Sequence, residues 1–127
     1  MIESGLTFRP MNQRPRSITI VSWICIVMGS IALVAGLLPI NGITRAQRIV
    51  ELKSHWYVHL SRAVEIISGI FMLYGQNWAR WLLVAWLVFH VYVGALHSAV
   101  HLISHALLFL IGIYLLFRPP ANAYFQK

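Results

Sequence analysis

The longest apolar stretch of the chain sets the strongest limit on its fold. Residues 78–117 include a single charged side chain, that of Arg80. One helix of that length would be about 60 Å long, twice the roughly 30 Å thickness of a bilayer core. The stretch must therefore fold back as a hairpin, and the polar residues around Ser98 are its natural corner. We expect helices over residues 78–97 and 99–117, with Ser98 as the N-cap of the second.

A second apolar run covers residues 17–40 and contains no charged residue. About 20 apolar residues are enough for a helix to cross the hydrocarbon core. Because a basic segment precedes the run, a cleaved signal peptide is the alternative. The apolar core of a signal peptide is usually ~7–15 residues long, however, and no A-x-A cleavage site follows this run. We therefore interpret it as a retained membrane-spanning helix.

The composition is typical of a membrane protein. Charged residues make up 10% of the 127 positions and hydrophobic residues 59%, whereas a soluble domain has about 25% charged residues. Disorder is excluded because it needs low hydrophobicity. The net charge of +7 comes from ten Lys and Arg against three acidic residues. Since the basic residues flank apolar runs, they indicate membrane topology rather than nucleic-acid binding.

The remaining segments complete one membrane domain over residues 1–127. Residues 55–74 form a further span, which is less apolar than the others. Residues 41–54 have a spacing that allows a short amphipathic interfacial helix. Residues 1–16 are a basic arm, and a short tail over residues 118–127 begins with Arg118-Pro119-Pro120, which stops the last helix. The predicted fold is thus an all-α integral membrane four-helix bundle.

Four spans place both termini on the same side of the membrane. By this topology six basic residues lie on the side of the termini and three on the other: Arg9, Arg14, Arg16, Arg80, Arg118 and Lys127 against Arg45, Arg48 and Lys53. Because an excess of Lys and Arg marks the cytoplasmic side, we expect both termini inside the cell. The chain is therefore predicted to be a multi-pass protein of the cell membrane.

Three ionisable residues lie deep within the predicted spans: Arg62 and Glu65 in residues 55–74, and His90 in residues 78–97. Such groups are costly in a bilayer and usually face the interior of a bundle or a water-filled cavity. We expect them to form one intramembrane polar cluster. Its functional interpretation is a proton relay or a polar ligand contact, and its structural interpretation, which we favour, is an interhelical clasp.

Five of the six histidines fall near the outer ends of the predicted spans. His55 and His59 are four residues apart, as are His101 and His105, and His97 lies at the hairpin corner. A pair at this spacing shares one helical face and suits a divalent transition metal or a haem iron. Because no cysteine or carboxylate accompanies them, we favour histidines that only hydrogen-bond at the wet membrane boundary. A bound metal or haem is the alternative.

Small residues gather along or near one face in three of the spans. They are Gly29, Ala32 and Gly36 in residues 17–40, Ser61, Ser68 and Gly69 in residues 55–74, and Gly94 and Ser98 near the end of residues 78–97. Small side chains let membrane helices approach closely, within one chain or between chains.

Three short motifs carry a resemblance to a known group. The start R-P-R-S-I-T-I-V-S-W (residues 14–23), the turn N-W-A-R (residues 77–80) and the end R-P-P-A-N-A-Y-F (residues 118–125) resemble small bacterial four-span membrane proteins of uncharacterised function. The resemblance implies the fold and a location in the bacterial inner membrane, but no activity. The histidine pairs are not part of this pattern.

No catalytic pattern stands out in the sequence. There is no phosphate-binding glycine loop and no H-E-x-x-H, and the chain has no Asp for a Ser/His/Asp set. We therefore expect no enzyme but a structural or accessory subunit, which binds a protein partner in a larger membrane assembly or associates with itself. The alternatives are a metal- or haem-binding protein that uses the outer histidines, and a proton-coupled transporter that uses Glu65.

Overall fold

The computed structural model describes residues 14–38 and 44–126, which form helices joined by short turns. The helices are α1 (Arg16–Leu37), α2 (Arg45–Ser54), α3 (Trp56–Leu73), α4 (Asn77–His97), α5 (Ala99–Phe117) and α6 (Pro119–Phe125). The predicted all-α class is confirmed. Most of the predicted basic arm, up to residue 13, lies outside the described residues.

Three helices, α1, α4 and α5, are long and apolar enough to cross a membrane. Their outer surfaces are covered by large apolar side chains. Leu110 on α5 and Ile31 on α1, for example, are 62% and 59% exposed. Soluble proteins rarely expose such continuous apolar surface, so these helices fit a membrane environment.

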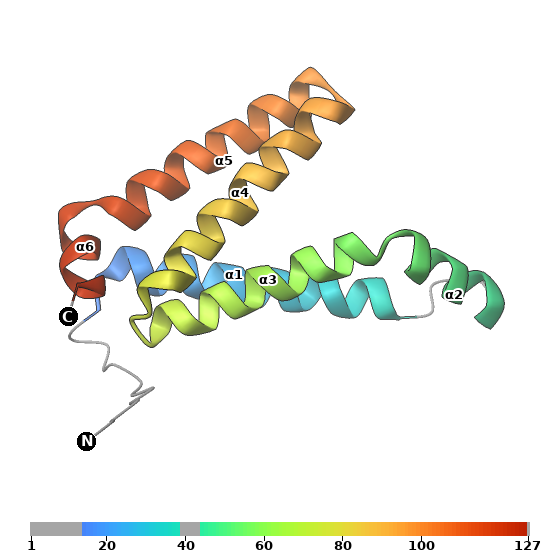
Figure 1. Ribbon diagram of the computed structural model, residues 1–127, viewed down its shortest axis with the longest axis horizontal. Coiled ribbons are helices and arrows are strands. Elements are labelled where there is room, and N and C mark those ends of the chain that lie inside the picture. Colours follow the sequence, from blue (N-terminus) through green and yellow to red (C-terminus); the bar gives the residue numbers. More distant parts are fainter. Residues whose placement is uncertain (1–13, 39–43, 127) are drawn as a thin grey trace.

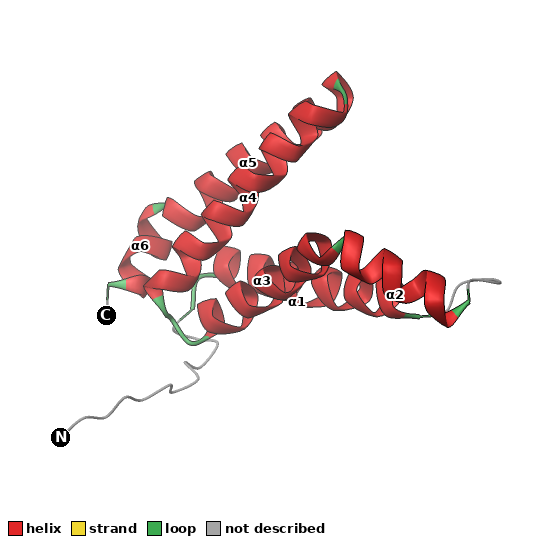
Figure 2. Ribbon diagram, turned by 45° about the vertical axis from the view of Figure 1, so that its right-hand side comes forward, coloured by secondary structure: helices red, strands yellow, loops and turns green. Residues whose placement is uncertain are grey.

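The long helices form two hairpins (Figure 1). In one, α1 packs against α3, and in the other α4 packs against α5. The hairpins meet through α3 and α4 near the start of α1 and the end of the chain, and both views show that they diverge toward the α4–α5 corner (Figures 1 and 2). This arrangement is more open than a four-helix bundle closed along its length.

The corner between α4 and α5 lies at the predicted position. The helices end and begin at His97 and Ala99, and Ser98 between them has extended backbone. The Ser98 hydroxyl accepts a hydrogen bond from the His101 backbone N–H at 3.3 Å, which satisfies one of the donors left unpaired at a helix start. The N-cap prediction is thus confirmed.

The contact between α1 and α3 depends on glycine. A Cβ atom at Gly69 would come within 2.7 Å of the Ser22 backbone oxygen, and one at Gly29 would come within 2.8 Å of Ile66 Cγ1. These glycines therefore let the two backbones approach more closely than any larger residue would. The predicted role of the small residues in helix packing is confirmed for this pair.

The buried core lies where the two hairpins meet. Its members come from both hairpins and from α6: Ile18, Cys25, Met72, Ala79, Leu83, Leu87, Leu116, Ala121, Tyr124 and Phe125. The Tyr124 hydroxyl donates to the backbone oxygens of Met72 and Leu73, at 3.2 and 2.9 Å. We call this part of the molecule the closed end and the α4–α5 corner the open end.

Helix α6 replaces part of the predicted tail. Arg118-Pro119-Pro120 does stop α5 at Phe117, as expected, but the two prolines occupy the first turn of a further helix. The first turn tolerates proline because its N–H groups have no partner within the helix. The same residues therefore end one helix and start the next.

Candidate functional site

Glu65 lies between α3 and α1. Its side chain is 7% exposed, and Oε2 is 3.7 Å from Nη1 of Arg62, one turn away on the same helix. A Cβ atom at Gly29 of α1 would be 3.4 Å from the same oxygen. The carboxylate therefore faces the interior of the first hairpin, whereas the Arg62 side chain is 34% exposed.

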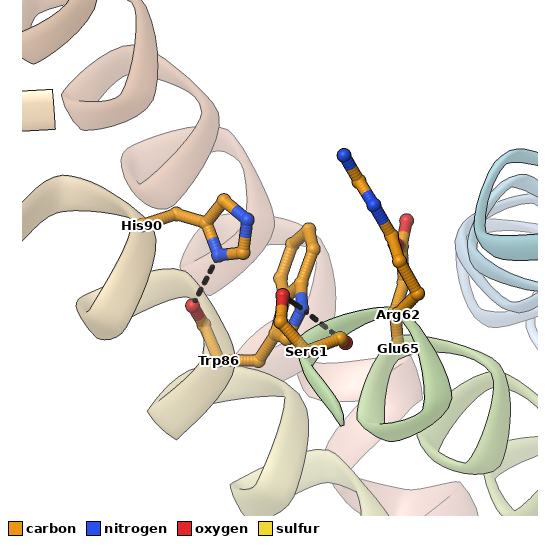
Figure 3. Close-up of polar contacts among 5 residues, drawn as sticks. All are labelled: Ser61, Arg62, Glu65, Trp86 and His90. Atoms are coloured by element: carbon orange, nitrogen blue, oxygen red, sulfur yellow. Dashed lines mark hydrogen bonds and ion pairs between the residues drawn. The ribbon is translucent and has the colours of Figure 1, made fainter. Parts of the chain in front are cut away.

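His90 contacts Trp86 rather than the Arg62–Glu65 pair with which it was predicted to cluster. Its Nδ1 is 3.0 Å from the Trp86 backbone oxygen, and its ring centroid lies 4.0 Å from that of the Trp86 indole. The indole N–H donates to Ser61, to the backbone oxygen at 2.8 Å and the hydroxyl at 3.1 Å. Figure 3 shows Arg62 and His90 on either side of this Trp86–Ser61 contact. The predicted cluster thus consists of an Arg62–Glu65 pair and a separately held histidine.

A groove of about 350 Å³ lies between α3 and α4, where the hairpins begin to diverge. Almost all of its surface is apolar, and four of its nine lining residues are aromatic. The lining residues are Trp56, Tyr57, Leu60, Ser61 and Val64 of α3 and Leu82, Ala85, Trp86 and Phe89 of α4. The hydrogen bond from Trp86 to Ser61 crosses from one wall to the other.

The outer histidines fall into two groups on different hairpins. His59 packs on α1, because a Cβ atom at Gly36 would lie 3.1 Å from its ring. His55 lies just before α3 and bonds the Ser54 hydroxyl at 2.9 Å. His97, His101 and His105 lie on the second hairpin, at the open end.

On the second hairpin, four histidines follow one another at contact distance. Ring centroids are 6.0 Å apart between His97 and His101, 6.4 Å between His101 and His105, and 5.8 Å between His105 and His90. We call these four residues the histidine row. Among the residues that the structure describes, no three His, Cys, Asp or Glu side chains are already gathered around one metal position.

Three features of this region do not follow from residue spacing. Ser61 and Trp86 are 25 positions apart, and the His90–His105 contact depends on how α4 and α5 rotate about their axes. The groove exists only because the hairpins diverge. Among the small residues noted in α3, Gly69 lies on the face that meets α1, whereas Ser61 faces α4.

The site thus offers an apolar groove, a partly exposed Arg62 side chain one residue along α3 from the groove wall, and a row of imidazole groups at the open end. The first two suit an apolar partner that carries a hydrogen-bond acceptor, and the third suits a metal ion or a proton. The function therefore has to be inferred from this geometry. No known protein family, curated protein or solved structure matches this chain.

Proposed function

We propose that the protein crosses the cell membrane four times, with α3 as the fourth span. Both α1 and α4 begin at the closed end (Figure 1). If each crosses the membrane from there, the chain between them has to return, and α3 is the helix that runs back beside α1. Arg62 and Glu65 make α3 less apolar than its neighbours, but the buried position of Glu65 keeps that carboxylate away from lipid.

The closed end is proposed to face the cytoplasm. Arg14, Arg16, Arg80 and Arg118 lie at this end. Arg45 and Lys53 lie on α2, at the far end of the first hairpin. The larger number of basic residues at the closed end supports a cytoplasmic location, because Lys and Arg accumulate on that side.

Within the membrane, the protein is proposed to act as an accessory subunit that holds one transmembrane helix of a larger assembly in the groove between α3 and α4. The groove is the observation that carries this proposal. It is open at the side, and its aromatic lining offers a large apolar contact area. The indole N–H of Trp86 and the Ser61 oxygens on this lining are already paired with each other.

The partly exposed side chain of Arg62 supports a protein occupant rather than an acyl chain. Arg62 follows Ser61 of the groove wall in the sequence, although it does not line the groove itself, and its side chain is 34% exposed. A charge exposed to hydrocarbon is costly, and an acyl chain has no group to accept its hydrogen bonds. A helix with a carboxylate or amide side chain near its middle would both fill the groove and pair with Arg62.

Photocrosslinking in native membranes tests the proposal. A benzophenone amino acid at Ala85, within the groove, is compared with one at Leu110, on the exposed face of α5. We expect Ala85 to give one protein adduct of defined mass and Leu110 to give lipid adducts alone. The Ala85 adduct should weaken at least tenfold in an Arg62→Gln background, because the pairing group is lost.

Two results would overturn the assignment. Lipid adducts alone at Ala85 would mean that an acyl chain fills the groove, and an adduct of twice the chain mass would mean that a second copy does. An adduct that is unchanged by Arg62→Gln would rule out the proposed pairing. Circular dichroism and detergent extraction of the Arg62→Gln protein establish that it folds.

A further inference from the structure

The histidine row differs from an ordinary set of interfacial histidines in how its rings are held. Nδ1 of His97 is 2.8 Å from the Val93 backbone oxygen, and Nδ1 of His105 is 2.7 Å from that of His101. His90 makes the same kind of bond to Trp86, at 3.0 Å. In each case the acceptor lies four residues earlier on the same helix.

These bonds decide which nitrogen of each ring remains available. A backbone oxygen only accepts hydrogen bonds, so Nδ1 must carry the proton in all three rings. In the neutral imidazole, Nε2 is then left with its lone pair. Histidines that bind metals nearly always donate their other N–H to a carbonyl or carboxylate in this way, which fixes the ring and raises the basicity of the ligating nitrogen.

The fourth ring is oriented by the corner of the hairpin. Nδ1 of His101 is 2.7 Å from the Ser98 hydroxyl, the group that also caps α5. Gly94 lets α4 and α5 approach here, because a Cβ atom on it would lie 2.8 Å from Nδ1 of His105. The hairpin therefore brings four imidazoles together. In each of them Nδ1 has an oxygen partner three or four residues earlier in the chain.

From this arrangement we propose that the histidine row binds one divalent transition-metal ion through Nε2 atoms. His101 and His105, four residues apart on one helical face, supply two ligands, and His90 or His97 supplies the third. His97 and His101 are exposed residues, so an ion can reach them without displacing packed neighbours. An all-imidazole set suits copper, zinc or nickel, and Cu²⁺ binds such sites most tightly.

The first hairpin provides a matched control. His55 and His59 are also four residues apart and near the membrane boundary, but they lie away from the row. The ring of His59 is packed against α1 at Gly36. If any histidine pair at this spacing bound metal, the two hairpins would contribute equally.

The test uses the full chain without an affinity tag, reconstituted in lipid nanodiscs. Isothermal titration calorimetry then measures how much Cu²⁺ the protein binds and how tightly. We expect one ion per chain. A His101→Ala/His105→Ala double variant should weaken binding at least tenfold, and a His55→Ala/His59→Ala double variant should change it less than twofold. Equal losses in the two double variants, or no loss in the first, would overturn the proposal.

A second measurement does not depend on any variant folding correctly. Electron paramagnetic resonance of the wild-type protein with one equivalent of Cu²⁺ should show coupling to two or more imidazole nitrogens. A spectrum with oxygen ligands only, or a wild-type protein that binds no Cu²⁺, would also refute the site. The inference is independent of the groove between α3 and α4, because the row lies on α4 and α5 and the crosslinking result does not affect it.

Discussion

Arg80 is a buried cation held by neutral groups. Its Nη1 donates to the Leu116 backbone oxygen at 3.3 Å and to the Asn122 side-chain oxygen at 2.6 Å. The guanidinium also lies 4.4 Å from the ring of Phe117 and 4.9 Å from that of Phe125. A guanidinium can stack on aromatic rings and donate several hydrogen bonds at the same time, which the ammonium group of lysine cannot do. The residue therefore joins the start of α4 to the end of α5 and to α6.

Tyr124 joins α6 to the other hairpin, and its hydroxyl can be removed without changing the shape of the side chain. The hydroxyl bonds two buried backbone oxygens at the end of α3. Tyr124→Phe should therefore lower the free energy of unfolding by about 1 kcal/mol. The measurement is SDS-induced unfolding in mixed micelles.

The matched control for this prediction is Tyr114→Phe on α5. Tyr114 is 68% exposed, whereas Tyr124 is 3% exposed, so the control should leave stability unchanged. Similar shifts in the two variants would show that the contact of Tyr124 with α3 contributes nothing to stability.

Contacts between distant residues could not be predicted from the sequence. Arg80 and Asn122 are 42 positions apart, and nothing in the local pattern of either points to the other. The turn N-W-A-R and the end R-P-P-A-N-A-Y-F are recognisable as motifs in the sequence, yet their contacts with each other exist only because α6 folds against α3 and α4. In these motifs Arg80, Asn122 and Tyr124 serve to hold the closed end together.

The helices themselves were much easier to predict. Residues 78–97 and 99–117 were expected to be helical, and α4 and α5 occupy Asn77–His97 and Ala99–Phe117. Apolar run length and polar interruptions are local properties, which explains this agreement. Helix α6 was missed because seven residues starting with two prolines contain more signals for ending a helix than for forming one.

The pairing of α1 with α3 makes a prediction about two glycines. In Gly69→Ala the new Cβ would lie 2.7 Å from a backbone oxygen of α1, which cannot move without displacing the helix. Stability should fall by about 1–3 kcal/mol. In Gly112→Ala the nearest atom is the end of the flexible Leu87 side chain, at 2.8 Å.

Gly112→Ala should therefore cost less than Gly69→Ala, since Leu87 can turn aside and alanine favours a helix. Thermal unfolding of the two variants in the same detergent gives the comparison. A larger loss for Gly112→Ala would show that the contact between α4 and α5, not that between α1 and α3, tolerates no added bulk.

At the scale of the whole molecule, the proposed topology places α2 and the α4–α5 corner on the same side of the membrane. Single cysteines at Val50, Val100 and Gln126, in a Cys25→Ser background, test this with a membrane-impermeant maleimide. Val50→Cys and Val100→Cys should react in intact cells, and Gln126→Cys only after permeabilisation. Labelling of Val50→Cys and Val100→Cys from opposite sides would show that α3 does not cross.

The single residue between α4 and α5 has a consequence for how the protein is made. With Ser98 alone separating the two helices, almost no hydrophilic chain would have to be carried across the bilayer with them. In the proposed topology they can leave the insertion machinery together, as one preformed unit. A soluble domain placed at Ser98 would require separate translocation, whereas the same domain fused after Gln126 would not. The second hairpin is thus suited to biogenesis in one step.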